Sequence, residues 1–235
     1  RQMCIRDSGY PMRNTFFSAS IKDIGWITEL CAKGRKGDTE LRAGVTKLIE
    51  NPLSRAELKE RAATALPDVP FWHVVRVAME SGHAVYSGAD QLITPVDLPG
   101  LEETFNGDKV AATAELMTRY FRTHGPATLH DFAWWAKLPQ RLIRPAAENL
   151  APDIMRCGEV SQDLVSAEIV EMAEARKKQS VLLLGAFDEY ILGYQDRLFA
   201  MTKEVHEVLV PGNRGVFRRA IVVEGQVRGT WNKQT

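Results

Sequence analysis

Three arginines stand close together at Arg214, Arg218 and Arg219, beside Gly212 and Gly215. A guanidinium group binds phosphate oxygens through charge-assisted hydrogen bonds, and glycine lets a backbone approach its ligand closely. The stretch therefore predicts a loop that contacts phosphate groups, such as those of a nucleic-acid backbone. A solvated loop without a ligand is the competing interpretation.

A second polar set begins a predicted helix at Gln140, and Arg141 and Arg144 follow in the same helix. Arginine pairs with guanine edges in the major groove and with phosphates, so these residues are candidates for DNA contact. They are explained equally well as solvent-facing helix residues. Pro145 lies inside the same helix and should kink or shorten it.

An earlier predicted helix carries His73 and Arg76 at the corresponding place. Both are candidates for DNA contact by the same reasoning. A structural role is favoured for this pair, because the neighbouring Phe71 and Trp72 suggest that the helix is largely buried.

The segment SVLLLGAFDEYILGYQDR combines an apolar run with several acids. The run predicts a buried strand that leads into a loop. Asp188 and Glu189 are adjacent carboxylates, but neighbouring side chains on a strand point to opposite faces, so they should not act on one atom. Loop caps and ion pairs are their expected roles, as is a pairing of Asp196 with Arg197. The loop's larger side chains are expected to pack, namely Phe187, Tyr190, Ile191 and Tyr194.

Composition narrows the class of protein. No apolar run approaches the roughly 20 residues that a membrane helix needs. Apart from Cys4, the cysteines are Cys31 and Cys157, and their spacing matches no metal-binding motif, so no metal or cofactor is expected. Two widely spaced thiols suggest the reducing environment of the cytoplasm. The 30 basic and 30 acidic residues cancel, which counts mildly against a nucleic-acid protein. The charge is uneven, however, since residues 117–147 and 176–235 are net positive.

One unit occurs twice, in residues 52–88 and 125–158. Each copy opens a helix with an N-cap hydroxyl and an acid three residues later. These pairs are Ser54–Glu57 and Thr128–Asp131. A second helix and a short β-pattern follow, and a further helix precedes each copy. Three helices and a β-hairpin form the winged helix-turn-helix arrangement. We therefore expect an α+β fold of tandem winged helix-turn-helix units and a small β-rich carboxyl-terminal part, with a hairpin turn at Glu224-Gly225.

Several segments of the chain resemble one bacterial family. They are YPMRNTFFSAS (10–20), TRYFRTHGPATLHDFAWW (118–135), LLLGAFDEYILGYQDR (182–197) and GVFRRAIVVEGQVRGTW (215–231). They are similar to the winged-helix DNA-binding proteins that include the AlkZ-like DNA glycosylases, and the resemblance covers essentially everything after Ser8. The most specific piece, FDEYILGYQDR, supplies the family-motif residues Asp188, Tyr190, Tyr194, Asp196 and Arg197.

The resemblance implies tandem winged helices that curve around duplex DNA. In some members of the family it also implies excision of alkylated or crosslinked bases by a Gln-x-Gln or Gln-x-Asp motif near the N-terminus. That motif would precede Tyr10, and the chain contains neither form. The family's usual Gly, Leu and His are replaced here by Asn14, Phe16 and Phe17. We therefore expect no catalytic residues in this chain, and DNA binding without catalysis.

The ends of the chain carry a separate expectation. Residues 1–8 back-translate to a string that contains a sequencing-library adapter, so we expect them to be foreign to the protein and the natural chain to be truncated at both ends. The expected parts are the end of a first winged helix at 9–38, a second at 39–100, a third at 101–175 and the β-rich part at 176–235.

The expected partner is double-stranded DNA, bound by a monomer without membrane contact. A transcriptional regulator is one alternative, although no long dimerisation helix is evident to match a palindromic site. A protein-interaction module without catalysis is another, since winged helices also bind proteins and the net charge is zero.

Overall fold

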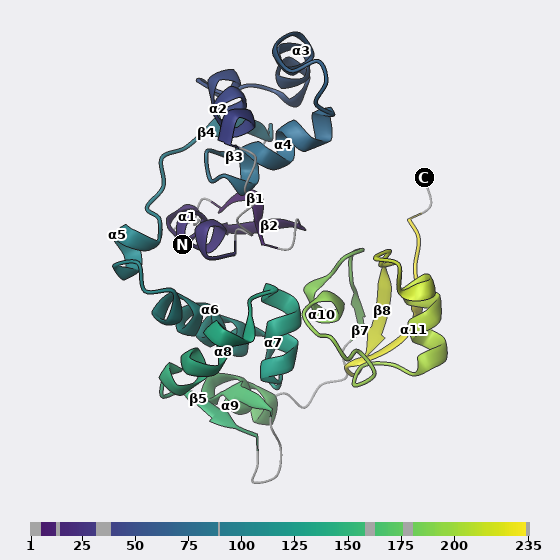
Figure 1. Cartoon of the computed structure of the whole chain (residues 1–235). Helices are drawn as coiled ribbons and strands as arrows, with labels where there is room; N and C mark the ends of the chain where they lie inside the picture. The colour runs from purple at the N-terminus through teal and green to yellow at the C-terminus, as the bar shows by residue number, and fades with distance from the viewer. Residues whose placement is uncertain are drawn as a thin grey trace. The chain divides into compact units, whose positions relative to one another are not determined.

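The computed structural model describes residues 6–12, 15–31, 39–88, 90–157, 163–175 and 181–233 (Figure 1). Helices and small antiparallel sheets make up this part of the chain, which confirms the mixed α and β class. The chain forms two compact units. The first comprises the chain as far as Leu116 together with Ala136–Ala146, and the second comprises Met117–Trp135 together with the chain from Ala147 onward. None of the described helices is long and apolar enough to cross a membrane.

The first unit opens with a β-hairpin followed by a helix. β1 (Arg6–Met12) pairs antiparallel with β2 (Thr15–Ser20), and α1 (Ile21–Cys31) follows directly. β1 also pairs with β3 (Ala84–Ser87), and β3 pairs with β4 (Leu92–Pro95), so the strand order is β2-β1-β3-β4. Asn14 lies outside the described residues. That Arg6–Ser8 belong to a strand does not test the expected foreign origin of residues 1–8.

The first predicted repeat is a run of three helices and a hairpin. Its elements are α2 (Thr39–Leu48), α3 (Arg55–Ala65), α4 (Phe71–Glu80), β3 and β4 (Leu92–Pro95). The predicted capping box at Ser54 is confirmed. The Glu57 amide donates to Ser54 Oγ at 3.2 Å, and the Ser54 amide donates to Glu57 Oε2 at 2.7 Å. The hydrogen bond from the Ser54 amide favours the charged carboxylate and lowers the pKa of Glu57.

The helices of this repeat bury one apolar face each against the hairpin. Leu53, just before the cap, exchanges backbone hydrogen bonds with Ile93 of β4, so the chain entering α3 is tied to the hairpin. The core beneath is formed by Val45, Ile49, Leu53, Leu58, Ala62, Val74, Val75, Val77, Ala78, Met79, Ala84, Tyr86 and Ile93.

The second repeat follows the same order along the chain. After α5 (Leu101–Phe105) come α6 (Lys109–His124), α7 (Leu129–Ala136), α8 (Gln140–Ala146), β5 (Ile154–Arg156), β6 (Leu164–Ser166) and α9 (Ala167–Ala175). Ala127 bridges to Leu164 as Leu53 bridges to Ile93 in the first repeat. The predicted cap is confirmed, because the Asp131 amide donates to Thr128 Oγ1 at 3.1 Å. As Pro145 predicts, α8 is short and gives way to a 3-10 turn.

A three-stranded sheet and two short helices complete the second unit. β7 (Val181–Leu183) pairs with β8 (Ala220–Val223), which pairs with β9 (Gln226–Thr230), and α10 (Glu189–Leu192) and α11 (Lys203–Leu209) lie between β7 and β8 in the chain. The predicted turn at Glu224-Gly225 is confirmed, since both residues have the positive φ that a two-residue hairpin requires, 51° and 76°.

The expectation that the apolar run at 181–184 forms a buried strand is wrong in part. The run does form β7, but Val181, Leu182 and Leu183 are all exposed. The physical reason is its place at the edge of the sheet, where it pairs with β8 alone among the described strands. An apolar run of this length predicts a strand without indicating which faces of it are covered. The core of this part is formed instead by Ile191, Leu192, Ala200, Met201, Leu209, Val210, Phe217, Ala220, Val222 and Val227.

Candidate nucleic-acid interface

Residues 211–219, here called the arginine loop, connect α11 to β8 and carry the three arginines. Arg214, Arg218 and Arg219 are all exposed. The Arg219 guanidinium lies over the ring of Trp231, 5.1 Å from its centroid, which holds the side chain in place while leaving it accessible. The predicted loop therefore exists, and its cations are available to a ligand.

The backbone of the arginine loop is fixed at several points. The Gly212 amide donates to Glu207 Oε1 at 2.7 Å, and the Arg218 amide donates to the Leu209 carbonyl at 3.0 Å. Phe217 is buried between the exposed arginines and anchors the loop to the core. A loop held in this way loses little conformational entropy on binding, which favours its use as a contact surface.

The helix that begins at Gln140 presents its polar residues to solvent. Gln140, Arg141 and Arg144 are exposed. The buried residues of the helix are Leu142, Ile143 and Ala146. The three polar side chains are therefore accessible, as a DNA contact requires, although the same exposure fits a plain surface helix.

One residue of helix α4 differs from the sequence-based expectation. Trp72, taken as a sign of burial, is 61% exposed. The ring of His73 stacks beside it at 5.4 Å, and the Arg76 guanidinium lies 5.5 Å from the indole centroid. Arg76 also pairs with Glu80 at 3.5 Å. Trp72 is an exception on a helix that is otherwise buried or half-buried, as expected. Phe71 packs against the core, and the buried residues of the helix are Val74, Val75, Val77, Ala78 and Met79.

The acids of the family motif have local structural roles. Asp188 is the N-cap of α10, where its Oδ1 accepts from the Tyr190 amide at 3.0 Å. Asp196 Oδ1 accepts from the Leu198 amide at 2.8 Å. The expectation of loop caps is confirmed, but the strand geometry assumed for Asp188 and Glu189 was wrong, because α10 begins there.

Arg197 is a buried cation, 6% exposed. Its Nε donates to the Ile191 carbonyl at 2.9 Å, and its guanidinium lies 5.0 Å from the Trp134 ring centroid and 5.1 Å from that of Phe217. Burying a charge is costly unless hydrogen bonds and aromatic faces compensate it. Arg197 therefore serves to join α7, α10 and the arginine loop within the second unit.

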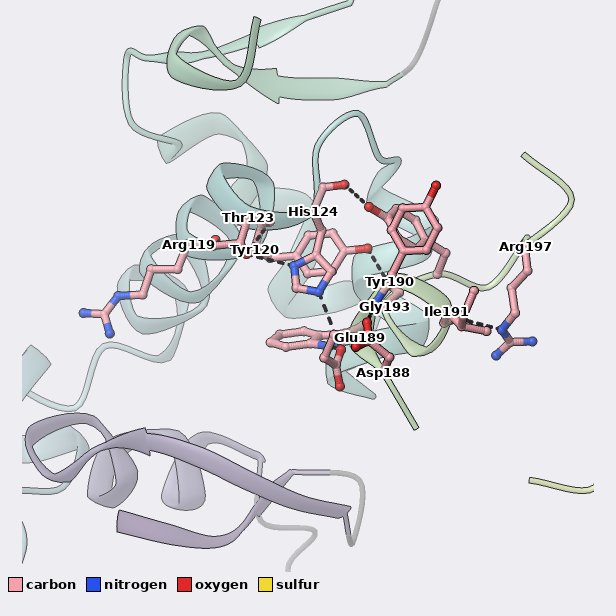
Figure 2. A network of polar contacts seen from close by, with 12 residues as sticks. Arg119, Tyr120, Thr123, His124, Asp188, Glu189, Tyr190, Ile191, Gly193 and Arg197 are labelled. Carbon is pink, nitrogen blue, oxygen red and sulfur yellow. Dashed lines mark hydrogen bonds and ion pairs between the residues drawn. The ribbon is translucent and has the colours of Figure 1, made fainter. Parts of the chain in front are cut away.

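A polar network joins the end of α6 to the start of α10 (Figure 2). Glu189 Oε2 accepts from Trp135 Nε1 at 3.0 Å and lies 3.5 Å from His124 Nε2. The His124 ring stacks on Tyr120 at a centroid distance of 4.6 Å. The network brings together two of the segments that carry the family resemblance, and the contacting residues are 54 or more positions apart in the sequence.

Two tyrosine hydroxyls extend this network into the loop after α10. Tyr120 donates to the Gly193 carbonyl at 2.7 Å, and Tyr194 donates to the carbonyl of His124. Burial raises the pKa of Tyr194 well above its ordinary value, and the neighbouring Tyr190 and Asp131 add to the shift. Only glycine fits at position 193, because a Cβ there would collide with the His124 ring. These contacts fix the loop in one conformation.

Sequence reasoning missed the partners of Glu189. In the sequence, Tyr120, His124 and Trp135 stand out only as parts of the segment 118–135 that carries the resemblance. No spacing rule links residues so far apart in sequence. A Tyr-x-x-x-His pair at positions 120 and 124, on one helix face, was the available signal.

The network does not assemble an acid–base pair. The Asp188 carboxylate caps a helix, and the Glu189 carboxylate is held by Trp135 and His124, so the two serve different partners. Among the residues that the structure describes, no three His, Cys, Asp or Glu side chains gather as a metal site requires. The arginine loop groups three exposed cations in the second unit.

Comparison with known proteins places the chain in a family. A solved structure, the DNA glycosylase AlkZ of Streptomyces sahachiroi, resembles this fold with a TM-score of 0.71 at 17% sequence identity, over 97% of this chain and 71% of that one. No curated protein matches the sequence. The family model for AlkZ-like DNA glycosylases matches residues 9–235. The chain therefore belongs to the AlkZ-like DNA glycosylase family.

Proposed function

We propose that this chain is a monomer that binds double-stranded DNA, mainly through the phosphate backbone. The observation that carries the proposal is the arginine loop, in which three exposed guanidinium groups stand on a backbone tied to the core. Arginine on a fixed loop suits phosphate oxygens, and such contacts supply most non-specific affinity for DNA. Membership of a glycosylase family supports a DNA partner.

The two repeats are, in this proposal, winged helices. Each runs helix, helix, helix and hairpin, and in each a backbone bridge ties the hairpin to the residue before the cap of the second helix. The third helix of such a unit enters the major groove of DNA. That role would fall to α8, with Gln140, Arg141 and Arg144, which are exposed. His73 and Arg76 of α4 are half-buried and Arg76 pairs with Glu80, so a structural role stays favoured for them.

The simultaneous replacement of the three arginines tests the proposal. Combining Arg214→Ala, Arg218→Ala and Arg219→Ala should lower the affinity for a 20-base-pair duplex by at least about tenfold, since each lost charge-assisted contact is worth more than a neutral hydrogen bond. Fluorescence anisotropy at fixed salt measures the affinity. The matched control combines Lys22→Ala, Lys47→Ala and Lys59→Ala, which removes three exposed positive charges elsewhere. Equal losses in both variants would contradict a specific role for the loop.

The same proposal expects no base excision by this chain. Neither Gln-x-Gln nor Gln-x-Asp occurs in its 235 residues. Asp188 and Asp196 form local caps, and Glu189 belongs to the network with Trp135 and His124. Incubation with alkylated duplex DNA, followed by chromatography of released bases, should give no product above a protein-free control. Release of a base at a rate that rises with protein concentration would show that other residues catalyse the reaction.

A further inference from the structure

Phe187 has an uncommon backbone conformation. Its φ is 61°, in the left-handed region that bulky side chains avoid, and its ring is 54% exposed. Residues 184–188, here called the aromatic loop, hold it there. Leu184 at one end pairs with Ala220 through two backbone hydrogen bonds, and Asp188 at the other end caps α10. A conformation that costs free energy and exposes an apolar ring favours neither stability nor solubility.

The aromatic loop and the arginine loop leave the sheet at the same end. Leu184 follows β7 and Ala220 begins β8, and these two residues are hydrogen-bonded neighbours across the antiparallel pair. Phe187 therefore follows the end of β7, and Arg219 directly precedes the start of β8, at the same end of the sheet. Trp231 links both, since its Nε1 donates to the Leu184 carbonyl and its ring carries the Arg219 guanidinium.

The Phe187 ring reaches the arginine loop directly. Its centroid lies 5.7 Å from that of Phe217, which is buried. Phe217 stands between Val216 and Arg218 in the chain, and both of these are exposed. The ring of Phe187 is thus supported by Phe217, whose chain neighbour Arg218 is exposed, and it still exposes more than half of its surface.

We propose that Phe187 stacks on an unstacked base of the DNA whose backbone the arginine loop holds, so that the preferred ligand is duplex DNA with an unpaired or poorly stacked base. The inference rests on the proposed DNA binding and names the class of DNA. Aromatic rings stack on any base face, and apolar side chains inserted at a base step displace its stacking. The cost of unstacking is least where pairing is already lost, which gives the preference for distorted duplex.

The competing explanation is that Phe187 only packs against Phe217. The strained φ separates the two explanations. Glycine adopts a positive φ without cost, so Phe187→Gly should leave the fold intact and its thermal stability equal or higher. If Phe187 served packing alone, replacing it would lower the thermal stability and leave the choice between DNA forms unaltered.

The test compares two duplexes of one sequence, fully paired or with a single unpaired 2-aminopurine. The wild-type chain should bind the second about tenfold more tightly, the value expected for one aromatic stack, and should quench the 2-aminopurine fluorescence. Phe187→Gly and Phe187→Ala should bind both duplexes with the affinity of the wild type for the paired one, whereas Phe187→Trp should keep the preference. The matched control is Phe199→Ala, another phenylalanine that is 48% exposed in the same unit, and it should keep the preference too.

The outcomes distinguish a failure of the proposed role of Phe187 from a failure of the proposed DNA binding. Binding to both duplexes without a preference, or a preference that survives in Phe187→Gly, would overturn the role of Phe187 and leave the arginine loop's role standing. A wild-type chain that binds neither duplex would overturn both.

Discussion

At the residue scale, the most informative contacts are those of single buried polar groups with defined partners. Tyr194 is an example, because its hydroxyl donates to the His124 carbonyl from a largely buried position. Removing one partner of such a bond costs the free energy of desolvating the other. The same holds for Glu189, which accepts from Trp135. These residues secure the loop after α10, from which the second unit's surface is built.

Tyr194→Phe should lower the free energy of unfolding by about 1 kcal/mol at neutral pH. In the folded chain the pKa of Tyr194 lies above its ordinary value of 10.0. A raised pKa means that the stabilisation is fully present below pH 10 and is lost as the pH rises beyond it, because the unfolded tyrosine ionises first. The stability difference between wild type and variant should therefore shrink above pH 10. Urea unfolding between pH 7 and pH 11 measures it, and parallel curves over that range would contradict the assignment.

At the scale of helices and strands, the two repeats use the same device to start their second helix. The cap amide-to-hydroxyl distances are 3.2 Å at Ser54 and 3.1 Å at Thr128. In each repeat the residue before the cap is bridged to the hairpin. The similarity indicates that the repeats fold by the same local rules.

Ser54→Ala and Thr128→Ala should each lower the free energy of unfolding by about 1 kcal/mol, the usual cost of losing an N-cap hydroxyl. Urea unfolding monitored by circular dichroism at 222 nm measures the change. Thr64→Ala is the control, because Thr64 lies exposed inside α3 and alanine is the better helix former there. A loss confined to one of the two caps would show that the repeats are not equivalent.

The elements could be predicted from sequence where the signal is local. Cap pairs marked both helix starts, Pro145 marked a short helix, and Glu224-Gly225 marked the hairpin turn. The sequence did not predict exposure correctly where exposure depends on residues distant in the chain. The apolar run of β7 and the aromatic Trp72 both suggested burial, yet both are exposed. The contacts of Glu189 with His124 and Trp135 could not be predicted, since they join segments that no spacing rule relates.

At the scale of the whole molecule, zero net charge conceals a local concentration of cations. The 30 basic and 30 acidic residues cancel, but acids of the second unit are used internally. Asp153 accepts two hydrogen bonds from Arg122 and Asp188 caps α10. The Arg122 guanidinium lowers the pKa of Asp153 below its usual range. We therefore propose that DNA contacts this unit through the exposed arginines of the arginine loop.

The salt dependence of DNA binding tests this central claim most directly. The logarithm of the association constant for duplex DNA should fall linearly with the logarithm of salt concentration, and each phosphate contact contributes about 0.9 to the slope. Replacing Arg214, Arg218 and Arg219 with alanine should reduce the magnitude of that slope by about 2 to 3, while the lysine control variant keeps it. A slope that is unchanged by the loss of the arginine loop, or binding that does not depend on salt, would contradict the account.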